Sequence, residues 1–266
     1  MLATPIVVSL LSALAADAPG PKVAVMYLYV HQSTVWKMAS GKIITEVKVD
    51  VEGVVGVEPN PRDPKTIYLA GKNPGKARVE LTDKDGAKEA FQVIVARKVS
   101  VPLGVPLTWD WPAKQPIQTV AGHDPKVVRA LVDETAKHRL RLEPLAEGEC
   151  FMTLTDPAGK TETVGVLVRK PDRLLEVGES ATLQPASKKA IRSAVVQDER
   201  VFQAKLLARR LVIAPGATPH EVRLEVEQGN PASLTVIGVA PGLAQLRIID
   251  ADDQVHVVWI GVKPKP

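Results

Sequence analysis

One block of sequence occurs three times in this 266-residue chain, and this repeat constrains the fold more than any other feature. The copies are AGKNPGKARVELTDKDGAKEAFQVIV, LAEGECFMTLTDPAGKTETVGVLV and GVAPGLAQLRIIDADDQVHVVWIGV. They align without a gap on one glycine and on an aspartate eight residues later, which are Gly75, Gly148 and Gly242 with Asp83, Asp156 and Asp250. The sequence therefore predicts three copies of one structural unit.

Matching positions upstream extend the repeat over most of the chain. They include Trp36/Trp109/Leu183, Ile44/Ile117/Ile191, Val54/Val127/Val201 and Leu69/Leu142/Val236. The first two copies keep one offset throughout, whereas the offset from second to third copy grows between Lys205 and Ala232. The third copy therefore carries an insertion in this interval.

Apolar and polar residues alternate after each glycine. The apolar positions are Ala77, Val79 and Leu81, then Cys150, Met152 and Leu154, then Ala244, Leu246 and Ile248. Alternation with a period of two predicts a strand with one buried face. A second alternating run follows the aspartate and its turn, so each copy should end in a hairpin.

The same reasoning predicts seven short strands in the first copy, at residues 23–30, 33–38, 42–50, 53–58, 66–70, 76–83 and 89–97. Seven short strands separated by turns favour a small immunoglobulin-like sandwich. The predicted fold class is thus all-β, with three tandem sandwiches. Small α+β repeats are the alternative, because residues 123–138 could form a turn or two of helix.

Composition and the N-terminus set limits on the class of protein. The net charge of +4 is dispersed, which argues against nucleic acid as a partner, and the single cysteine allows no intramolecular disulfide. Residues 1–16 are typical of a secretory signal peptide, and no later run is long and apolar enough to span a membrane. We therefore expect a periplasmic, cell-envelope or surface protein, with repeats at 22–98, 99–170 and 171–266.

No arrangement typical of a catalytic or cofactor site is found in the sequence. The five histidines show no metal-ligand spacing, and no phosphate-binding glycine loop or serine-histidine-aspartate set is evident. Cys150 falls at a strand position occupied by alanine in the other copies, which indicates a core residue rather than a nucleophile. The prediction is a non-enzymatic protein without cofactors.

The repeated pattern of the turns gives two structural predictions. The aspartates Asp83, Asp156 and Asp250 could join neighbouring carboxylates in a calcium site, but capping of a tight turn by each side chain is the favoured interpretation, so we predict no metal. The glycines Gly75, Gly148 and Gly242 should have a positive φ or lie against a closely approaching backbone.

The insertion in the third copy, at about 206–231, has the pattern of an extra hairpin with one apolar face. Val222, Leu224 and Val226 alternate with charged residues, and Arg209 and Arg210 stand at the base. The apolar face should cover either its own sandwich or a partner. We predict that this hairpin is an interaction surface, because an added edge ribbon can pair with another chain.

A family resemblance comes from the second and third copies. Leu103-Gly104, the turn Asp124 to Val127, Gly148 and the turn Asp156 to Gly159 resemble the N-terminal domain of tight-adherence pilus-assembly secretins. The third copy matches at Val177-Gly178, Asp198, Val201, Gly242 and Asp250 but has Asp253 in place of a glycine, and the first copy departs at His31 and Val51. Bacterial Ig-like repeats share much of this pattern.

The resemblance implies a non-enzymatic envelope scaffold or accessory protein in pilus assembly or secretion. Its partners would be proteins, such as a secretin or like modules. The second function hypothesis is a surface-exposed Ig-like adhesive or ligand-binding protein.

Overall fold

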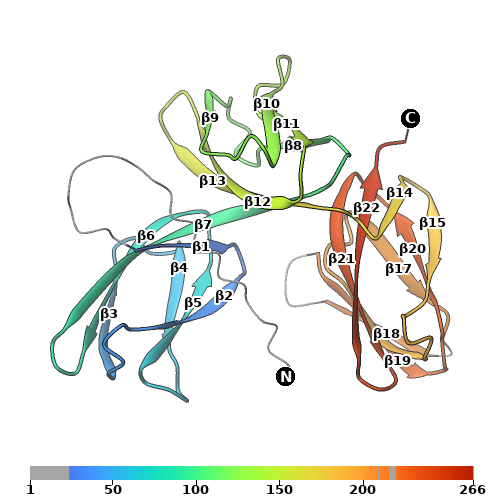
Figure 1. Ribbon diagram of the computed structural model, residues 1–266, viewed down its shortest axis with the longest axis horizontal. Coiled ribbons are helices and arrows are strands. Elements are labelled where there is room, and N and C mark those ends of the chain that lie inside the picture. The colour runs from blue at the N-terminus through green and yellow to red at the C-terminus, as the bar shows by residue number, and fades with distance from the viewer. Residues whose placement is uncertain (1–23, 209, 216–219, 266) are drawn as a thin grey trace. The chain divides into compact units, whose positions relative to one another are not determined.

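The computed structural model describes residues 24–208, 210–215 and 220–265, which form 22 strands and no helix. The fold is all-β and consists of tandem immunoglobulin-like sandwiches, as predicted (Figure 1). The α+β alternative is wrong, because residues 123–138 contain the strand β10 (Val128–Val132) and turns. The predicted signal peptide at residues 1–16 lies outside the described residues.

The first sandwich contains all seven strands that the alternation predicts. One sheet contains β3 (Ile44–Val49), β6 (Gly75–Asp83) and β7 (Lys88–Pro102), with β1 (Ala24–Tyr29) beside β7. The other sheet has the order β2 (Ser33–Lys37), β5 (Thr66–Gly71) and β4 (Val55–Pro59). Alternate residues of both sheets meet in one core, whose fully buried members include Leu69, Val79, Leu81, Phe91, Val93 and Val95.

The second sandwich follows without an intervening loop, since β7 runs through the predicted boundary between residues 98 and 99. Its small sheet has the order β10, β11 (Arg139–Pro144) and β8 (Leu107–Asp110). The strands β13 (Thr161–Arg169), β12 (Gly148–Thr155) and β9 (Thr119–Ala121) continue the sheet of β7. By their contacts, the described residues from 24 to 98 group with Thr161–Gly165, and Val99–Lys160 group with the described residues after 165.

The third sandwich has two strands more than the first. One sheet has the order β14 (Arg173–Glu176), β22 (Val255–Lys263), β21 (Gly242–Asp250), β16 (Ile191–Val196), β19 (Val222–Gln228) and β18 (Arg210–Pro215). The other contains β15 (Ser180–Leu183), β20 (Leu234–Gly238) and β17 (Phe202–Leu206). The additional strands β18 and β19 come from the predicted insertion and form the predicted hairpin.

The first and last strands of the first and third sandwiches pair in parallel. β1 pairs with β7 from Ala24↔Phe91 to Tyr29↔Ala96, and β14 pairs with β22 from Arg173↔Ile260 to Glu176↔Lys263. The turn after the first strand of each of these sandwiches needs a residue in the left-handed conformation. In the third sandwich this residue is Gly178, with φ 85°. His31 takes the same conformation in the first, with φ 67°, so its departure from the glycine pattern leaves the turn intact.

Candidate interaction surfaces

Two of the repeated glycines, Gly75 and Gly148, are required for side-chain packing rather than for an unusual backbone. A Cβ atom at Gly148 would lie 3.0 Å from Cγ2 of Val127, and one at Gly75 would lie 2.9 Å from Cγ2 of Val54. Gly242 has the same relation to Val201, at 3.0 Å. Neither Gly75 nor Gly148 has a positive φ, whereas Gly242 has φ 158°. The prediction of a close backbone is therefore wrong: the neighbour of each glycine is a valine side chain, and this valine is itself one of the repeated anchors.

Each repeated aspartate caps the turn that follows it. Oδ1 of Asp156 accepts hydrogen bonds from the amides of Ala158 and Lys160, both at 2.9 Å. Asp83 and Asp250 bind the amides two and four residues later in the same way, at 2.9–3.0 Å. All three side chains are buried. These carboxylates therefore satisfy turn amides, as the capping interpretation predicts.

Asp250 has an additional partner within its hairpin. Its Oδ2 lies 2.9 Å from Nε2 of His256. The hydrogen bond with His256, together with those from the Ser187 hydroxyl and the turn amides, holds the pKa of Asp250 well below its usual range. The role of this pair is thus structural: it keeps a buried carboxylate ionised and fixes the hairpin β21–β22.

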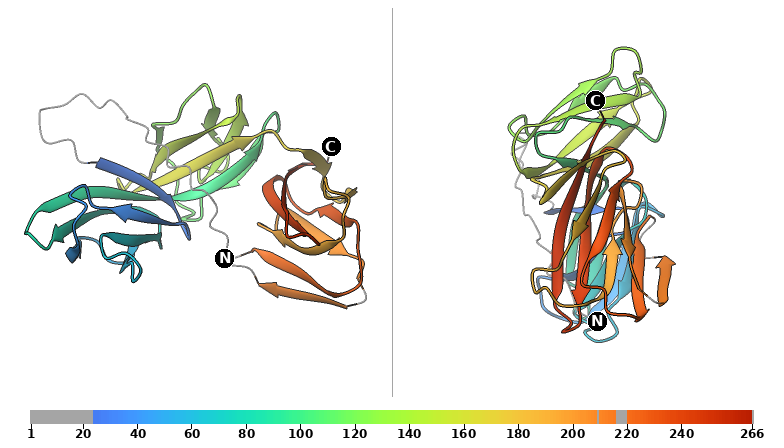
Figure 2. Two further views of the ribbon diagram at one scale, coloured as in Figure 1. Left: turned by 60° about the horizontal axis from the view of Figure 1, so that its bottom comes forward. Right: turned by 90° about the vertical axis from the view of Figure 1, so that its right-hand side faces the viewer.

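The apolar face of the predicted hairpin β18–β19 covers its own sandwich. Leu224 is 2% exposed and belongs to the third core, and Val222 and Val226 pack against that core. The hairpin reaches this position because β19 pairs antiparallel with β16, with Leu224 opposite Ala194. Figure 2 shows the hairpin, in orange, along the side of the third sandwich. The β19 half of this apolar face is therefore already covered.

The outer side of the hairpin is its exposed part. β18 is the last strand of the six-stranded sheet, and Ile213 on it is 67% exposed. Leu207, just before the strand, is 92% exposed. Arg210 begins β18, whereas Arg209 and the side chain of Arg210 lie outside the described residues. An interaction through this hairpin would therefore use the β18 edge.

The three sandwiches differ at one strand position, which lies next to the first strand of the closing hairpin of each repeat. This position is occupied by β3 beside β6, by β9 beside β12 and by β16 beside β21. In the third sandwich β16 lies between β21 and β19. In the second, β9 has only three residues. In the first, β3 has six residues and, among the described strands, pairs only with β6 (Figure 1). We did not predict this open edge, although the absence of the hairpin from the first copy was a signal for it.

The sheet face next to the open edge is charged and slightly hollow. Glu46 and Lys48 of β3 form an ion pair at 3.1 Å, and Arg78 and Glu80 of β6 form another at 3.1 Å. A hollow of about 440 Å³ is lined by Lys48, Val49, Asp50, Arg78 and Glu80. Both ion pairs are exposed, so they contribute little to stability, but they give the edge a defined charge pattern.

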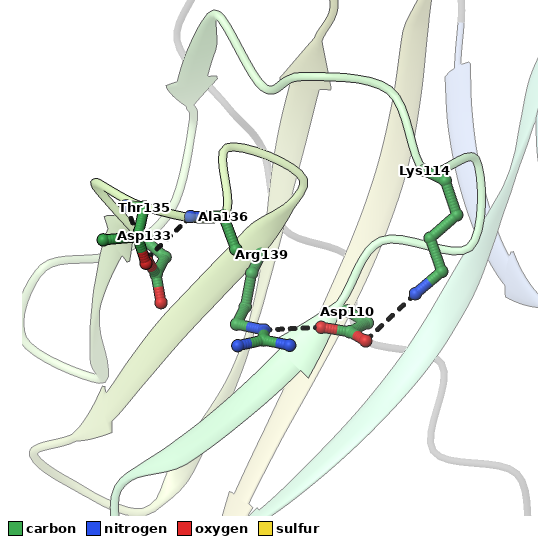
Figure 3. A network of polar contacts seen from close by, with 6 residues as sticks. All are labelled: Asp110, Lys114, Asp133, Thr135, Ala136 and Arg139. Atoms are coloured by element: carbon green, nitrogen blue, oxygen red, sulfur yellow. Dashed lines mark hydrogen bonds and ion pairs between the residues drawn. The ribbon is translucent and has the colours of Figure 1, made fainter.

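A second charged network connects β8 and β11 in the second sandwich (Figure 3). Asp110 accepts hydrogen bonds from Nε of Arg139 at 2.7 Å and from Nζ of Lys114 at 3.0 Å. These bonds lower the pKa of Asp110 to about 2. The amide of Ala136, with the hydroxyl and amide of Thr135, lowers the pKa of Asp133 to about 2. Both carboxylates thus support the adjoining turns.

An exposed apolar strip lies on the outer face of the third sandwich. Val255 and Val257 of β22 are 49% and 48% exposed, and Leu174 of β14 is 43% exposed. Their neighbours Val258, Ile260 and Val262 point the other way, into the core. Such a strip on one sheet face offers a surface for contact with another molecule.

The described residues show neither a metal site nor a membrane span. Within them, no group of three or more histidine, cysteine, aspartate or glutamate side chains could hold a metal ion. Nor does the described part of the chain contain a helix of the length and apolar character needed to cross a membrane. Cys150 is buried, and burial raises the pKa of its thiol, as expected for a core residue.

Comparison with known proteins gives similarity at the level of fold only. The chain matches no protein-family model and no curated protein sequence. Among solved structures it is similar to the glucan-utilisation protein SGBP-B of Bacteroides ovatus, with 12% identity over 96% of this chain and 70% of that one, at a TM-score of 0.24. Domains 4 and 5 of the S-layer protein SbsC give 14% identity over 83% and 99%, at 0.23. The human desmocollin-1 ectodomain gives 10% over 92% and 57%, at 0.20.

Proposed function

We propose that the chain is a non-enzymatic scaffold or accessory protein of a bacterial cell envelope, associated with pilus assembly or secretion. It would act through protein–protein contacts made by its sandwiches. The observation that carries this proposal is the variation of one sheet edge, which is open at β3, short at β9 and covered by a hairpin at β16. Repeats that have the same core pattern but differ at one sheet edge are suited to contacts in which a strand of a partner is added to that edge.

The association with pilus assembly or secretion is supported by the sequence resemblance described above. Export across the inner membrane would bring the chain to the compartment in which such machinery is assembled. The signal-peptide pattern of residues 1–16 supports export. The repeated aspartate turns support a structural repeat, because their carboxylates bind turn amides rather than standing free.

Deletion of the gene in the producing bacterium tests this function. We expect loss of pilus assembly or of a secreted substrate, and restoration by the full chain. Affinity purification of the full chain after cross-linking in the envelope should recover a secretin or another component of that machinery. Normal piliation and secretion in the deletion strain, with the chain found in the cytoplasm, would reject the proposal.

The outer strip of Leu174, Val255 and Val257 supports a second candidate, a surface-exposed adhesive or ligand-binding protein. Exchange of Val257 for Asp would weaken such binding while leaving the core unchanged, since the side chain points outward. The matched control is Val258→Asp, which should unfold the third sandwich instead. Loss of surface attachment in V257D cells with normal piliation would favour this candidate over the first.

A further inference from the structure

The open edge of β3 leaves the core of the first sandwich less covered than that of the third. Ile44, Val47 and Val49 of β3 are half-buried at the margin of their core. Their counterparts Ile191, Ala194 and Val196 are at most 1% exposed, because Val222, Leu224 and Val226 of β19 pack beside them. The first sandwich therefore lacks a neighbouring strand at the place where the third has one.

The backbone of β3 is oriented to accept such a strand. The amide of Asp50 donates to the carbonyl of Arg78 at 3.2 Å, and Lys48 stands opposite Glu80 in the same antiparallel pair. Successive residues of a strand direct their amides and carbonyls to opposite sides. Since Lys48 and Asp50 face β6, Val47 and Val49 direct theirs to the open edge.

The charges on the outer face indicate which strand would fit. Glu46 and Lys48 are both exposed and stand on either side of Val47. We propose that β3 pairs antiparallel with β3 of a second copy, about a two-fold axis at Val47. Glu46 then lies opposite Lys48 of the second copy, and Lys48 opposite its Glu46. A two-fold interface of this kind is self-complementary, so one patch serves both partners.

The alternative registers are less favourable. A shift of two residues in one direction places Glu46 opposite Glu46, and a shift in the other places Lys48 opposite Lys48. Like charges directly opposite one another destabilise a strand pair. The register centred on Val47 also brings Ile43, which is 41% exposed, towards Val51 of the second copy, which is 43% exposed. Charge and apolar exposure therefore select the same register.

The hollow at the end of β3 agrees with this arrangement. It is lined by Val49, Asp50 and Arg78 among others, at the end of β3 where the antiparallel partner begins its own strand. The partner's residues before Ile44 therefore approach this hollow. The inference rests on the proposed function in that both require protein contacts through a sheet edge, but it names the partner as a second copy of this chain.

Charge reversal tests the pairing in the full chain. Lys48→Glu places two like-charged pairs across the axis and should raise the dimer dissociation constant by about tenfold or more. Glu46→Lys should do the same. An equimolar mixture of the two variants should recover a dimer, because each Glu then meets a Lys. Lys76→Glu, on the exposed face of β6 and away from the edge, is the matched control and should not change association.

Sedimentation velocity over a range of protein concentrations measures these effects, and circular dichroism establishes that each variant is folded. A chain that is monomeric at all concentrations would overturn the proposal. So would variants that associate like the parent, or a mixture that does not recover the dimer.

Cysteine cross-linking tests the register. In a Cys150→Ala background, the variants E46C and K48C should form a disulfide with each other when mixed, because these positions lie opposite one another. Each variant alone should cross-link much less. Preferential linkage of E46C to itself would contradict the register, and linkage of K48C to a cysteine at Ile213 would show that β18 is the occupant instead.

The two proposals fail in distinguishable ways. A monomeric chain that still co-purifies with pilus or secretion components overturns the β3 pairing alone. A dimer with the predicted register, in cells whose piliation and secretion do not depend on the gene, overturns the proposed function and leaves the pairing intact.

Discussion

At the scale of single residues, the repeated positions are explained by contacts between them. Gly148 and Val127 recur in all three copies because the glycine leaves room for the valine methyl groups. Asp156 recurs because its carboxylate binds two amides of the turn. In the third copy Asp253 replaces the turn glycine and takes the same left-handed conformation, with φ 63°.

Substitution of Gly148 tests the packing explanation. Gly148→Val should reduce the free energy of unfolding of the second sandwich by roughly 1–3 kcal/mol, because the added side chain overlaps Val127. Combination with Val127→Ala should cost less than the sum of the two single changes. Hydrogen exchange of the β12 amides measures the free energy of unfolding of the single and the double variants. Strict additivity would show that the two side chains do not compete for space.

The stability of the second sandwich should depend on pH because of its ion-paired carboxylates. The pKa of Asp110 is lowered from 3.8 to about 2 by Arg139 and then Lys114. A carboxylate whose pKa is lower in the folded than in the unfolded chain stabilises the folded state when the pH is above its unfolded-state pKa. This contribution is lost as pH falls from about 4 to 2. The free energy of unfolding of the second sandwich, measured from amide protection factors corrected for the intrinsic exchange rate at each pH, should therefore fall over this interval, and Asp110→Asn should flatten the change. The effect should be small because both partners are exposed.

At the scale of elements, the strands could be predicted from the sequence better than their pairing. Alternation with a period of two located the seven strands of the first sandwich, since each has one face in the core. The insertion was also recognised as a hairpin. Its position was not, because it lies in sequence between β17 and β20, which belong to one sheet, and yet it joins β16 in the other. Such long-range pairing leaves no periodic signal.

The hairpin's contribution to the third core can be measured. Leu224→Ala should cost roughly 2–5 kcal/mol, because the side chain is buried among the residues of that core. Ile213→Ala, on the exposed strand of the same hairpin, should cost little. Urea unfolding monitored by hydrogen exchange of β16 and β19 distinguishes the two. Equal effects would mean that the hairpin is a surface decoration. Replacement of residues 207–229 by a short turn should therefore weaken the third sandwich.

At the scale of the whole molecule, the fold class and the threefold repetition followed from the sequence. The open edge of β3 and the interaction surfaces did not, because they depend on which strands have neighbours. Val51 illustrates the limit for a single residue. Asp124 and Asp198 cap the corresponding turns through their side chains, which a valine side chain cannot do, so the first sandwich departs from the other two at this turn.

Calcium should not stabilise the chain. Oδ1 of each repeated aspartate already accepts two amide hydrogen bonds, and within the described residues no group of three or more acidic, histidine or cysteine side chains could hold a metal ion. We expect the same melting temperature in millimolar Ca²⁺ and in EDTA. A rise of several degrees with Ca²⁺ would indicate a site that binds the folded state.

The parallel pairing of β14 with β22 determines how the third sandwich responds to mechanical force. When its two ends are pulled apart, the paired strands slide along each other and their evenly spaced hydrogen bonds are loaded together. A pull applied at Gly242 and Val262, which face each other in an antiparallel pair, opens the hydrogen bonds one after another. Single-molecule stretching should therefore give a higher unfolding force from the ends than from these two positions. Equal forces would contradict this reasoning. A sandwich with this arrangement is suited to carrying tension along the chain.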